Sequence, residues 1–330
     1  MRTKLFEVLA CPKCLGELCC SRVKLKRGDE IIEGELRCIR YGCIFPIENG
    51  IPRFVSRDSY ASSFGYQWNQ FRLEQLDSFN GTTLSENRFY TETNWSKDWM
   101  DGKWILDAGC GAGRFLDVAS KTGAEVVGID LSNAVDAAGI NLAGRSNVHL
   151  VQASIYDLPF RSQSFDGCYC IGVIQHTPNP RKALQSLPRI LKAGGDIAVT
   201  IYERRRWTRL YSKYLLRPLT KRLSDEMLLR IISVAMPALF PITNFLFQLP
   251  YLGRLFMFTI PVANYVNEKE LSPQQRYNWA ILDTFDMLSP KFDHPQTQFE
   301  VEQALNGEGI TNLRRIPVQG LTLNGKRIGN

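Results

Sequence analysis

Residues 104–131 read WILDAGCGAGRFLDVASKTGAEVVGIDL, and this stretch decides the fold. An apolar run ends at Asp107, three alternate glycines follow, a helical stretch comes next, and a second apolar run ends at Asp130. Glycine permits a positive φ and lets the backbone approach a ligand without a Cβ in the way. The stretch therefore predicts a strand, a glycine turn, a helix and a second strand, with a ligand on the turn.

The same alternation continues on the carboxyl side of this stretch, up to residue 202. Further apolar runs are NVHLVQAS, FDGCYCIGV and GGDIAVTIY, and helical stretches separate them. Strands that alternate with helices predict βαβ units in a mostly parallel sheet with right-handed crossovers. We expect an α/β fold, a Rossmann-like sheet with helices on both faces, whose ligands bind beyond the carboxyl ends of the strands.

Two acids narrow the identity of the ligand. Asp130 lies 17 residues after Gly113, where a carboxylate at a strand end accepts hydrogen bonds from ribose hydroxyls. The spacing G-x-G-x-G differs from the G-x-G-x-x-G of pyrophosphate binding. Asp107 suits the ammonium of a methionine moiety, which a dinucleotide lacks. These residues resemble motif one of the class I S-adenosylmethionine methyltransferases; the alternative is that the glycines only make tight turns in an α/β fold.

The resemblance covers residues 60–205 and implies methyltransferase activity with S-adenosylmethionine as cofactor. The later motifs, in the family's order, are VQASIYDLPF, FDGCYCIGVIQHTPNP and LPRILKAGGDIAVTIY. The family often has an Asp at the adenine amine, where this chain has Ser154. The implied cofactor contacts are Asp107, Ala108, Gly109, Cys110, Gly111, Gly113, Asp130, Leu131, Ser154, Ile155, Cys170 and Ile171, with Tyr66 and Trp68 as capping rings.

Catalytic candidates follow from the chemistry of methyl transfer. A sulfonium donor needs in-line positioning and, for hydroxyl or carboxyl acceptors, removal of a proton. His176 follows a strand at the predicted binding edge and is the candidate base or substrate contact; packing is its alternative role. His294 and Tyr202 are further candidates for the active site, whereas His149 lies inside a strand and is expected to be structural.

Cysteines are concentrated near the amino terminus, with six of the nine in residues 1–43. The first residues do not read as a secretory signal, so we expect a cytoplasmic protein in which clustered cysteines bind metal rather than form disulfides. CPKC at 11–14, RCIRYGC at 37–43 and GIPRFV at 50–55 resemble the zinc-ribbon domain fused to some methyltransferases and also found as a separate activating subunit. The resemblance implies a β-rich module with structural zinc.

The candidate zinc ligands are Cys11, Cys14, Cys38 and Cys43. When this sequence is aligned with the zinc-ribbon family on the FPI and GIPRF stretches, Tyr41 and not a cysteine occupies the position of the expected fourth ligand. Three alternatives therefore stay open: Cys43 binds from a widened loop, Cys19 or Cys20 supplies the fourth thiolate, or the module has lost its metal and survives as a packed fold.

Residues 203–264 interrupt the α/β pattern. Eight Lys or Arg residues and no acid lie between Arg204 and Arg222, and no charge lies between Ile231 and Gly253. The uncharged stretch approaches the length of a membrane span, yet its prolines are expected to cut it into short helical pieces. We expect a helical insertion that covers the active site. Contact with a membrane surface, a role only as a lid or dimer surface, and a true span are the alternatives that stay open.

These features predict five regions. They are 1–55, the zinc-ribbon-like module; 56–100, a helical lead-in or cofactor cap; 101–202, the S-adenosylmethionine-binding core; 203–264, the basic and apolar insertion; and 265–330, the C-terminal part of the methyltransferase domain. Hydrophobic residues make up 44% and charged residues 22% of the chain, which excludes wholesale disorder.

The predicted function is methyl transfer to oxygen or carbon of a small-molecule or lipid- or glycan-linked acceptor. The fourth motif has no NPPY-like tetrapeptide of the kind that serves amino-group methylation. Two alternatives stay open: an RNA or protein methyltransferase that uses the ribbon for recognition, and a non-catalytic binding subunit. Nucleic acid is the less favoured partner, because the positive charge, +7 in total, is concentrated in one segment.

Overall fold

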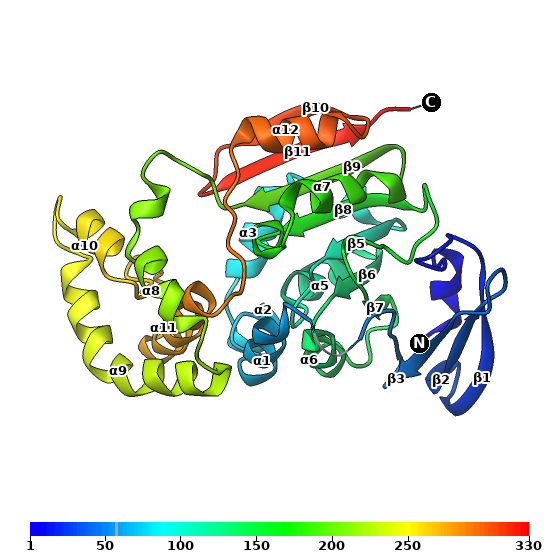
Figure 1. Ribbon diagram of the computed structural model, residues 1–330, viewed down its shortest axis with the longest axis horizontal. Coiled ribbons are helices and arrows are strands. Elements are labelled where there is room, and N and C mark those ends of the chain that lie inside the picture. Colours follow the sequence, from blue (N-terminus) through cyan, green and yellow to red (C-terminus); the bar gives the residue numbers. More distant parts are fainter. Residues whose placement is uncertain (57–58, 330) are drawn as a thin grey trace.

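Two sheets organise the protein in the computed structural model, which describes residues 1–56 and 59–329 (Figure 1). A four-stranded antiparallel sheet forms the amino-terminal module, and a seven-stranded sheet has the order β10-β11-β9-β8-β5-β6-β7. The predicted Rossmann-like α/β fold, with a β-rich module and a helical insertion, is confirmed.

The larger sheet is parallel from β5 to β9, and a carboxyl-terminal hairpin extends it in antiparallel fashion. Its strands are β5 (Trp104–Ala108), β6 (Glu125–Asp130), β7 (Val148–Gln152), β8 (Phe165–Ile171), β9 (Leu191–Ile201), β10 (Ile310–Ile316) and β11 (Leu321–Arg327). Alternate residues of each strand pack on opposite faces: Leu106 joins one apolar cluster and Ile105 the other. Both faces are buried, as expected of a parallel sheet.

Helices cover both faces of this sheet. On one face lie α7 (Pro180–Ser186) and α12 (Gln298–Asn306); on the other lie α3 (Leu84–Thr93), α5 (Arg114–Ala119) and α6 (Ala134–Asn141). The lead-in adds α1 (Ser62–Gln70), α2 (Asp77–Asn80) and α4 (Lys97–Met100). Short 3-10 turns are η1 (Thr3–Glu7), η2 (Ser120–Thr122), η3 (Ile174–His176), η4 (Pro188–Ile190) and η5 (Thr208–Leu210).

The amino-terminal module lies against the β7 edge of the large sheet (Figure 1). Its strands are β1 (Leu18–Arg27), β2 (Glu30–Cys38), β3 (Ile44–Glu48) and β4 (Ile51–Pro52). The chain leaving β4 pairs with β7, because Arg53 forms a parallel bridge with Gln152 and the Phe54 amide donates to the Gln152 carbonyl at 2.8 Å. The module therefore covers an edge that would otherwise present unpaired backbone groups.

The insertion is a group of helices at the far end of the molecule from this module (Figure 1). It contains α8 (Ser212–Thr220), α9 (Asp225–Leu246) and α10 (Gly253–Thr259), and α11 (Pro273–Leu288) packs between α9 and the core. Helix α9 is long and apolar enough to cross a membrane by length and composition, but only 22% of its apolar window is buried inside the protein.

The expectation that prolines cut this stretch into short pieces is wrong for α9, which runs unbroken over 22 residues. Pro237 and Pro241 both lie at exposed positions in it. The carbonyls four residues earlier, which lose their helical donors, belong to the equally exposed Ser233 and to Pro237. Because these positions are exposed to solvent, the lost hydrogen bonds do not leave buried carbonyls without a donor, and the helix continues.

Candidate functional site

A cavity of about 1050 Å³ opens at the carboxyl ends of β5, β6, β8 and β9. One wall is the glycine turn after β5, a second comes from α1 and α3, and a third from α8, α10 and α11. Pockets for one small ligand typically measure roughly 300–1,000 Å³. This cavity therefore lies at the upper end of that range.

The glycine turn brings backbone to the cavity wall. Gly109 has φ +93°, and a Cβ there would lie 2.4 Å from the Val173 side chain, so only glycine fits. Gly111 has φ +52°, and the Trp68 indole lies over it, with Nε1 3.1 Å from the position of a Cβ. The turn requires glycine for its own packing, and it leaves bare backbone facing the cavity.

Asp107 lies at the end of β5, behind this turn. The side chain is buried, and its Oδ2 has no hydrogen-bond partner within the described chain. Burial raises the pKa of Asp107 well above its usual value; the nearby Tyr169 hydroxyl opposes that rise and the Asp130 carboxylate adds to it. An unpaired buried carboxylate is costly and indicates a missing cationic or donor partner.

Asp130 ends β6 and lines the cavity. Its Oδ2 accepts from the Gly111 amide at 3.0 Å, and its Oδ1 accepts from the amide and hydroxyl of Ser132 at 2.8 and 2.7 Å. Burial raises the pKa of Asp130 and these donors oppose the rise. A carboxylate offers about four lone-pair sites, so one on Oδ2 is left for a ligand hydroxyl.

The structure brings only part of the predicted cofactor set to the cavity. Those that line it are Gly109, Cys110, Gly111, Asp130, Leu131, Ile155, Ile171 and Trp68. Asp107, Ala108, Gly113, Ser154, Cys170 and Tyr66 do not line it; Asp107 lies behind the glycine turn that does. Ser154 instead caps a turn by accepting from the Tyr156 amide at 3.1 Å, and Tyr66 packs on Phe285 with ring centroids 6.1 Å apart. Ala153, which was not predicted, lies in the wall beside Ile155.

His176 lies in the cavity wall after β8, as its position in the sequence predicted. Its Nδ1 lies 3.1 Å from the Phe292 carbonyl, which only accepts, so Nδ1 carries the proton and Nε2 keeps a lone pair in the neutral ring. Burial lowers the pKa of His176, although Asp286 and Asp293 oppose the change. The geometry is that of a neutral imidazole prepared to accept a proton.

Tyr202 and His294 differ in placement. Tyr202 lines the cavity and lies edge-on to the His176 ring, with centroids 5.5 Å apart. His294 does not line the cavity; its amide donates to the Gln175 carbonyl at 2.7 Å, and its ring lies beside Phe292. His149, expected to be structural, bonds Glu125 at 2.8 Å and stacks on Trp104, so that expectation is confirmed.

The acceptor side of the cavity contains groups that sequence reasoning did not assign. Lys213 of α8 pairs with the buried Asp293 at 2.8 Å and lies over the rings of Tyr202 and Tyr214. Asp283 and Asp286, one turn apart on α11, also line it. Burial raises the pKa of Asp283 to about 7. No local motif marks these residues, since they meet only through the tertiary fold.

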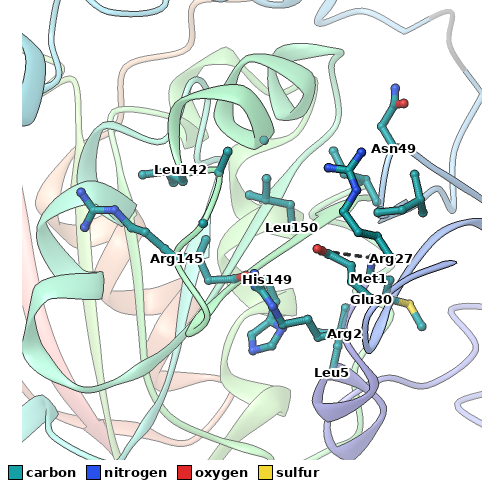
Figure 2. Close-up of a pocket in the computed structure, with 17 residues that line it drawn as sticks. Met1, Arg2, Leu5, Arg27, Glu30, Asn49, Leu142, Arg145, His149 and Leu150 are labelled. Atoms are coloured by element: carbon teal, nitrogen blue, oxygen red, sulfur yellow. Dashed lines mark hydrogen bonds and ion pairs between the residues drawn. The ribbon is translucent and has the colours of Figure 1, made fainter.

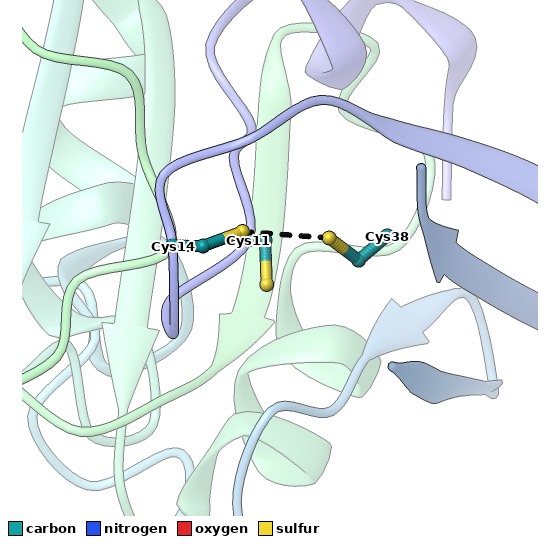
Figure 3. Close-up of side chains that lie close together, drawn as sticks. All are labelled: Cys11, Cys14 and Cys38. Carbon is teal, nitrogen blue, oxygen red and sulfur yellow. Dashed lines mark hydrogen bonds between the residues drawn. The ribbon is translucent and has the colours of Figure 1, made fainter. Parts of the chain in front are cut away.

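Three cysteines of the amino-terminal module form a separate cluster (Figure 3). The sulfurs of Cys11, Cys14 and Cys38 all lie within 4.8 Å of one another, and Cys14 and Cys38 are 3.5 Å apart. Tetrahedral zinc with bonds of about 2.3 Å places thiolates roughly 3.8 Å apart, so the three fit that ion. The Tyr41 amide lowers the pKa of Cys38, which favours the thiolate.

The Cys43 sulfur is not part of this group. Cys43 is tied to Cys38 through the backbone, because its carbonyl accepts from the Cys38 amide at 2.8 Å. The position held by Tyr41 therefore contributes an amide to the cluster rather than a ligand side chain.

A second, smaller cavity of about 250 Å³ lies between the module and the large sheet (Figure 2). Arg2 and Glu30 reach it from the module, and Arg145 and His149 from the sheet side. Arg145, however, is paired with Asp117, and the Met1 amine bonds the Ile31 carbonyl at 2.5 Å. The contact across the cavity comes from Arg2, whose guanidinium donates to the Val148 carbonyl of the large sheet at 3.0 Å.

Comparisons with known proteins agree with both units. Residues 106–199 match the family model described as a methyltransferase domain, and residues 2–50 match that of Trm112p-like protein. The ubiquinone biosynthesis O-methyltransferase of Alkalilimnicola ehrlichii is 31% identical over 133 residues, 38% of this chain and 54% of the relative. The O-methyltransferase resE of Aspergillus sclerotiorum is 35% identical over 103 residues, 30% of this chain and 39% of the relative. The chain thus spans about half the length of the curated relatives it matches.

Among solved structures, the chain resembles a SAM-dependent methyltransferase from Aquifex aeolicus at 15% identity and TM-score 0.40, covering 82% of this chain and 97% of that one. A complex containing the Haloferax volcanii Trm112 methyltransferase activator matches at 14% identity and TM-score 0.44, covering 83% of this chain and 100% of that one. The chain thus has one segment, residues 106–199, that is similar to a methyltransferase domain, and another before it, residues 2–50, that is similar to a Trm112p-like protein.

Proposed function

We propose that this protein transfers a methyl group from S-adenosylmethionine to an oxygen atom of a small-molecule acceptor. The observation that carries the proposal is the unpaired, buried Oδ2 of Asp107 behind a glycine turn, with Asp130 at the end of the next strand. The names of the matched relatives, which are O-methyltransferases, support oxygen over carbon as the acceptor atom.

The residues of the cavity, and the Asp107 carboxylate behind its wall, fit this cofactor. Asp107 would pair with its ammonium, and the lone-pair site left on Asp130 would accept a ribose hydroxyl. Leu131, Ala153 and Ile155 would supply the apolar surface for the adenine ring. When bound, the cofactor supplies an activated methyl group on its sulfonium. The other predicted contacts, Ala108, Gly113, Ser154, Cys170 and Tyr66, would act by shaping the turns and helices around the cavity.

His176 is the proposed base. Its Nε2 accepts the proton of the acceptor hydroxyl, while Nδ1 donates to the Phe292 carbonyl and fixes the orientation of the ring. Phe64 and Tyr202 pack against the ring, at centroid distances of 5.0 and 5.5 Å, and exclude water from it. Tyr202 is proposed as an acceptor contact, and His294 as a support for the loop behind His176.

We propose further that the acceptor is a small molecule or a lipid- or glycan-linked molecule and that the reaction takes place in the cytoplasm. The large cavity and its aromatic wall support an amphiphilic acceptor, and the basic and apolar residues 203–264 are the candidate for peripheral membrane contact. In the Trm112p-like domain, the proposed role of zinc is structural, because a closed thiolate site has no open position for chemistry.

The test is calorimetry with S-adenosylmethionine, followed by transfer of its labelled methyl group to a panel of catechols, phenols and aliphatic alcohols. We expect micromolar binding and label in an ether product that is resistant to mild base. Absence of cofactor binding would refute the proposal. If the protein binds S-adenosylmethionine but transfers the methyl group to tRNA or to a protein and to no hydroxyl compound, the proposed acceptor class is wrong.

A further inference from the structure

Helix α9 has apolar residues on its outer face as well as on its inner face. Leu228, Ile232 and Met236 are buried against α11. Met227, Ile231, Val234, Ala238, Ile242 and Phe245, spaced three or four residues apart on the other face, are all exposed. Val234 is 74% exposed and Phe245 67% exposed. A surface helix normally presents polar residues to water, so this face lacks the partner that its composition requires.

The neighbouring helices also carry exposed apolar side chains. Leu215 and Leu219 are exposed on α8, Leu252 and Leu255 are exposed at the start of α10, and Tyr251 between α9 and α10 is 99% exposed. We name the exposed apolar side chains of α8, α9 and α10 the insertion face. The helices α8, α9 and α10 that carry these side chains lie at one end of the molecule (Figure 1), opposite the Trm112p-like domain.

The insertion face carries a strong excess of positive charge. Between Arg204 and Thr259 there are ten Lys or Arg residues and two acids. Within residues 1–56 and 59–329, the exposed cations of this segment that have no ion pair are Arg206, Arg209, Lys221, Arg222, Arg230 and Arg254. A second copy of this chain would bring like charges together, whereas an anionic surface neutralises them.

The packing of α9 decides between lying on a bilayer and crossing it. The inner face of α9 is part of an apolar cluster with Ala280, Phe285 and Leu288 of α11. A membrane span would have to leave that cluster, whereas an interfacial helix keeps it and buries only the outer face. Long Lys and Arg side chains reach from such a helix to lipid headgroups.

We propose that the insertion face docks on an anionic lipid bilayer and that the acceptor enters the cavity from that bilayer. Tyr211, Lys213 and Tyr214 at the start of α8 and Met257 of α10 line the cavity, while Leu215 and Leu255 of the same helices are exposed. The helices that touch the lipid thus also form the acceptor wall. The entry of the acceptor rests on the proposed function; the docking does not.

The experiment is co-sedimentation of the full chain with phosphatidylcholine vesicles, with and without phosphatidylglycerol, at low and high salt. The test variant is Val234→Glu with Phe245→Glu, and the matched control is Ile140→Glu with Phe299→Glu, two exposed apolar residues outside the insertion. We expect the wild type and the control to bind anionic vesicles and the test variant to bind at least about tenfold more weakly. Lys221→Gln with Arg222→Gln should weaken binding to anionic vesicles by about 25-fold, roughly fivefold per cation.

Equal vesicle binding by the test variant and the control would overturn the proposal. Absence of vesicle binding by the wild type would also overturn it. Measurement of the molecular mass in solution would then show whether a second copy covers the insertion face, since in that case the wild type is a dimer and the test variant a monomer. Calorimetry with S-adenosylmethionine and turnover of a soluble acceptor without vesicles are measured on every variant. Normal values there, with lost vesicle binding, separate docking from the proposed function.

Discussion

His149 and His176 are both buried, but their partners give them opposite roles. His149 bonds the Glu125 carboxylate at 2.8 Å, and Glu125 in turn pairs with Lys4 of the Trm112p-like domain at 2.6 Å. His176 has only a backbone carbonyl on Nδ1 and lies in the cavity wall. The same side chain is thus a structural link in one place and the proposed base in the other.

The pH dependence of methyl transfer tests His176. Burial lowers its pKa below the ordinary value of about 6.5, so the ring is neutral at pH 7 and gains a proton only as the pH falls through that lowered pKa. We expect kcat/KM to fall only as the pH drops through this lowered pKa, at a pH below 6.5. His176→Asn should reduce kcat by about 10²–10⁴-fold and remove this acid limb.

His149→Asn is the matched control for that variant, with unchanged kcat and lower stability. Asp283, whose pKa is raised to about 7, titrates in the same cavity. If kcat/KM of His176→Asn still falls at acid pH, that fall is assigned to Asp283. If kcat of His176→Asn is unchanged, His176 is not part of the mechanism.

Asp107 should show a trade-off between stability and binding. Its pKa is raised by burial, so ionisation destabilises the folded protein, and this cost appears as the pH rises through the unfolded pKa of about 4. Asp107→Asn should therefore leave the ligand-free protein at least as stable at pH 7. Its affinity for S-adenosylmethionine should fall by about 10–100-fold, since it loses one charge-assisted bond.

Calorimetry and urea denaturation measure the two effects on Asp107→Asn. The exposed Asp157, on the same edge of the sheet, provides the control variant Asp157→Asn. Equal cofactor affinity in the two variants would mean that Asp107 does not contact the cofactor.

At the scale of elements, the Arg53 side chain adds to the backbone pairing between β7 and the chain leaving β4. Arg53 is buried, and its guanidinium donates to Gln152 Oε1 at 2.8 Å and to Asp136 Oδ1 at 2.6 Å. Arg53→Ala should lower the free energy of unfolding by about 2 kcal/mol, because both acceptors lose a charged donor. Urea denaturation measures this, with the exposed Arg37→Ala as control; equal midpoints would show that backbone pairing alone holds the edge.

Metal content tests the thiolate cluster. We expect about one zinc per chain in the purified protein, and Cys38→Ser should lower it to near zero because two thiols do not complete a structural site. Cys19→Ser, an exposed cysteine outside the cluster, should keep the zinc. Cys43→Ser decides whether Cys43 is the fourth ligand. Less than about a tenth of an equivalent in the wild type would mean a metal-free packed module.

At the scale of the whole molecule, local patterns predict the core better than the cavity. Strand β5, the glycine turn and β6 follow from apolar runs and glycines that are neighbours in the sequence. The acceptor wall does not, because Lys213 meets Asp293 and Phe64 meets His176 across large sequence separations. The sequence did not predict that α9 is continuous. The free-energy cost of an internal proline depends on whether the carbonyl four residues earlier is exposed to solvent, and the sequence does not give that exposure.

The Trm112p-like domain and the methyltransferase domain share one core, which predicts cooperative unfolding. Leu5, Leu9 and Leu36 of the first belong to the same buried cluster as Val127 and Phe160 of the second. If either domain unfolds, the apolar side chains of the other domain in this cluster become exposed to water. Heating should therefore expose the Cys11 and Cys38 thiols, measured by labelling after chelation, at the same temperature at which near-ultraviolet circular dichroism of the core is lost. Thiol labelling that precedes the loss of core signal would show that the domains unfold independently.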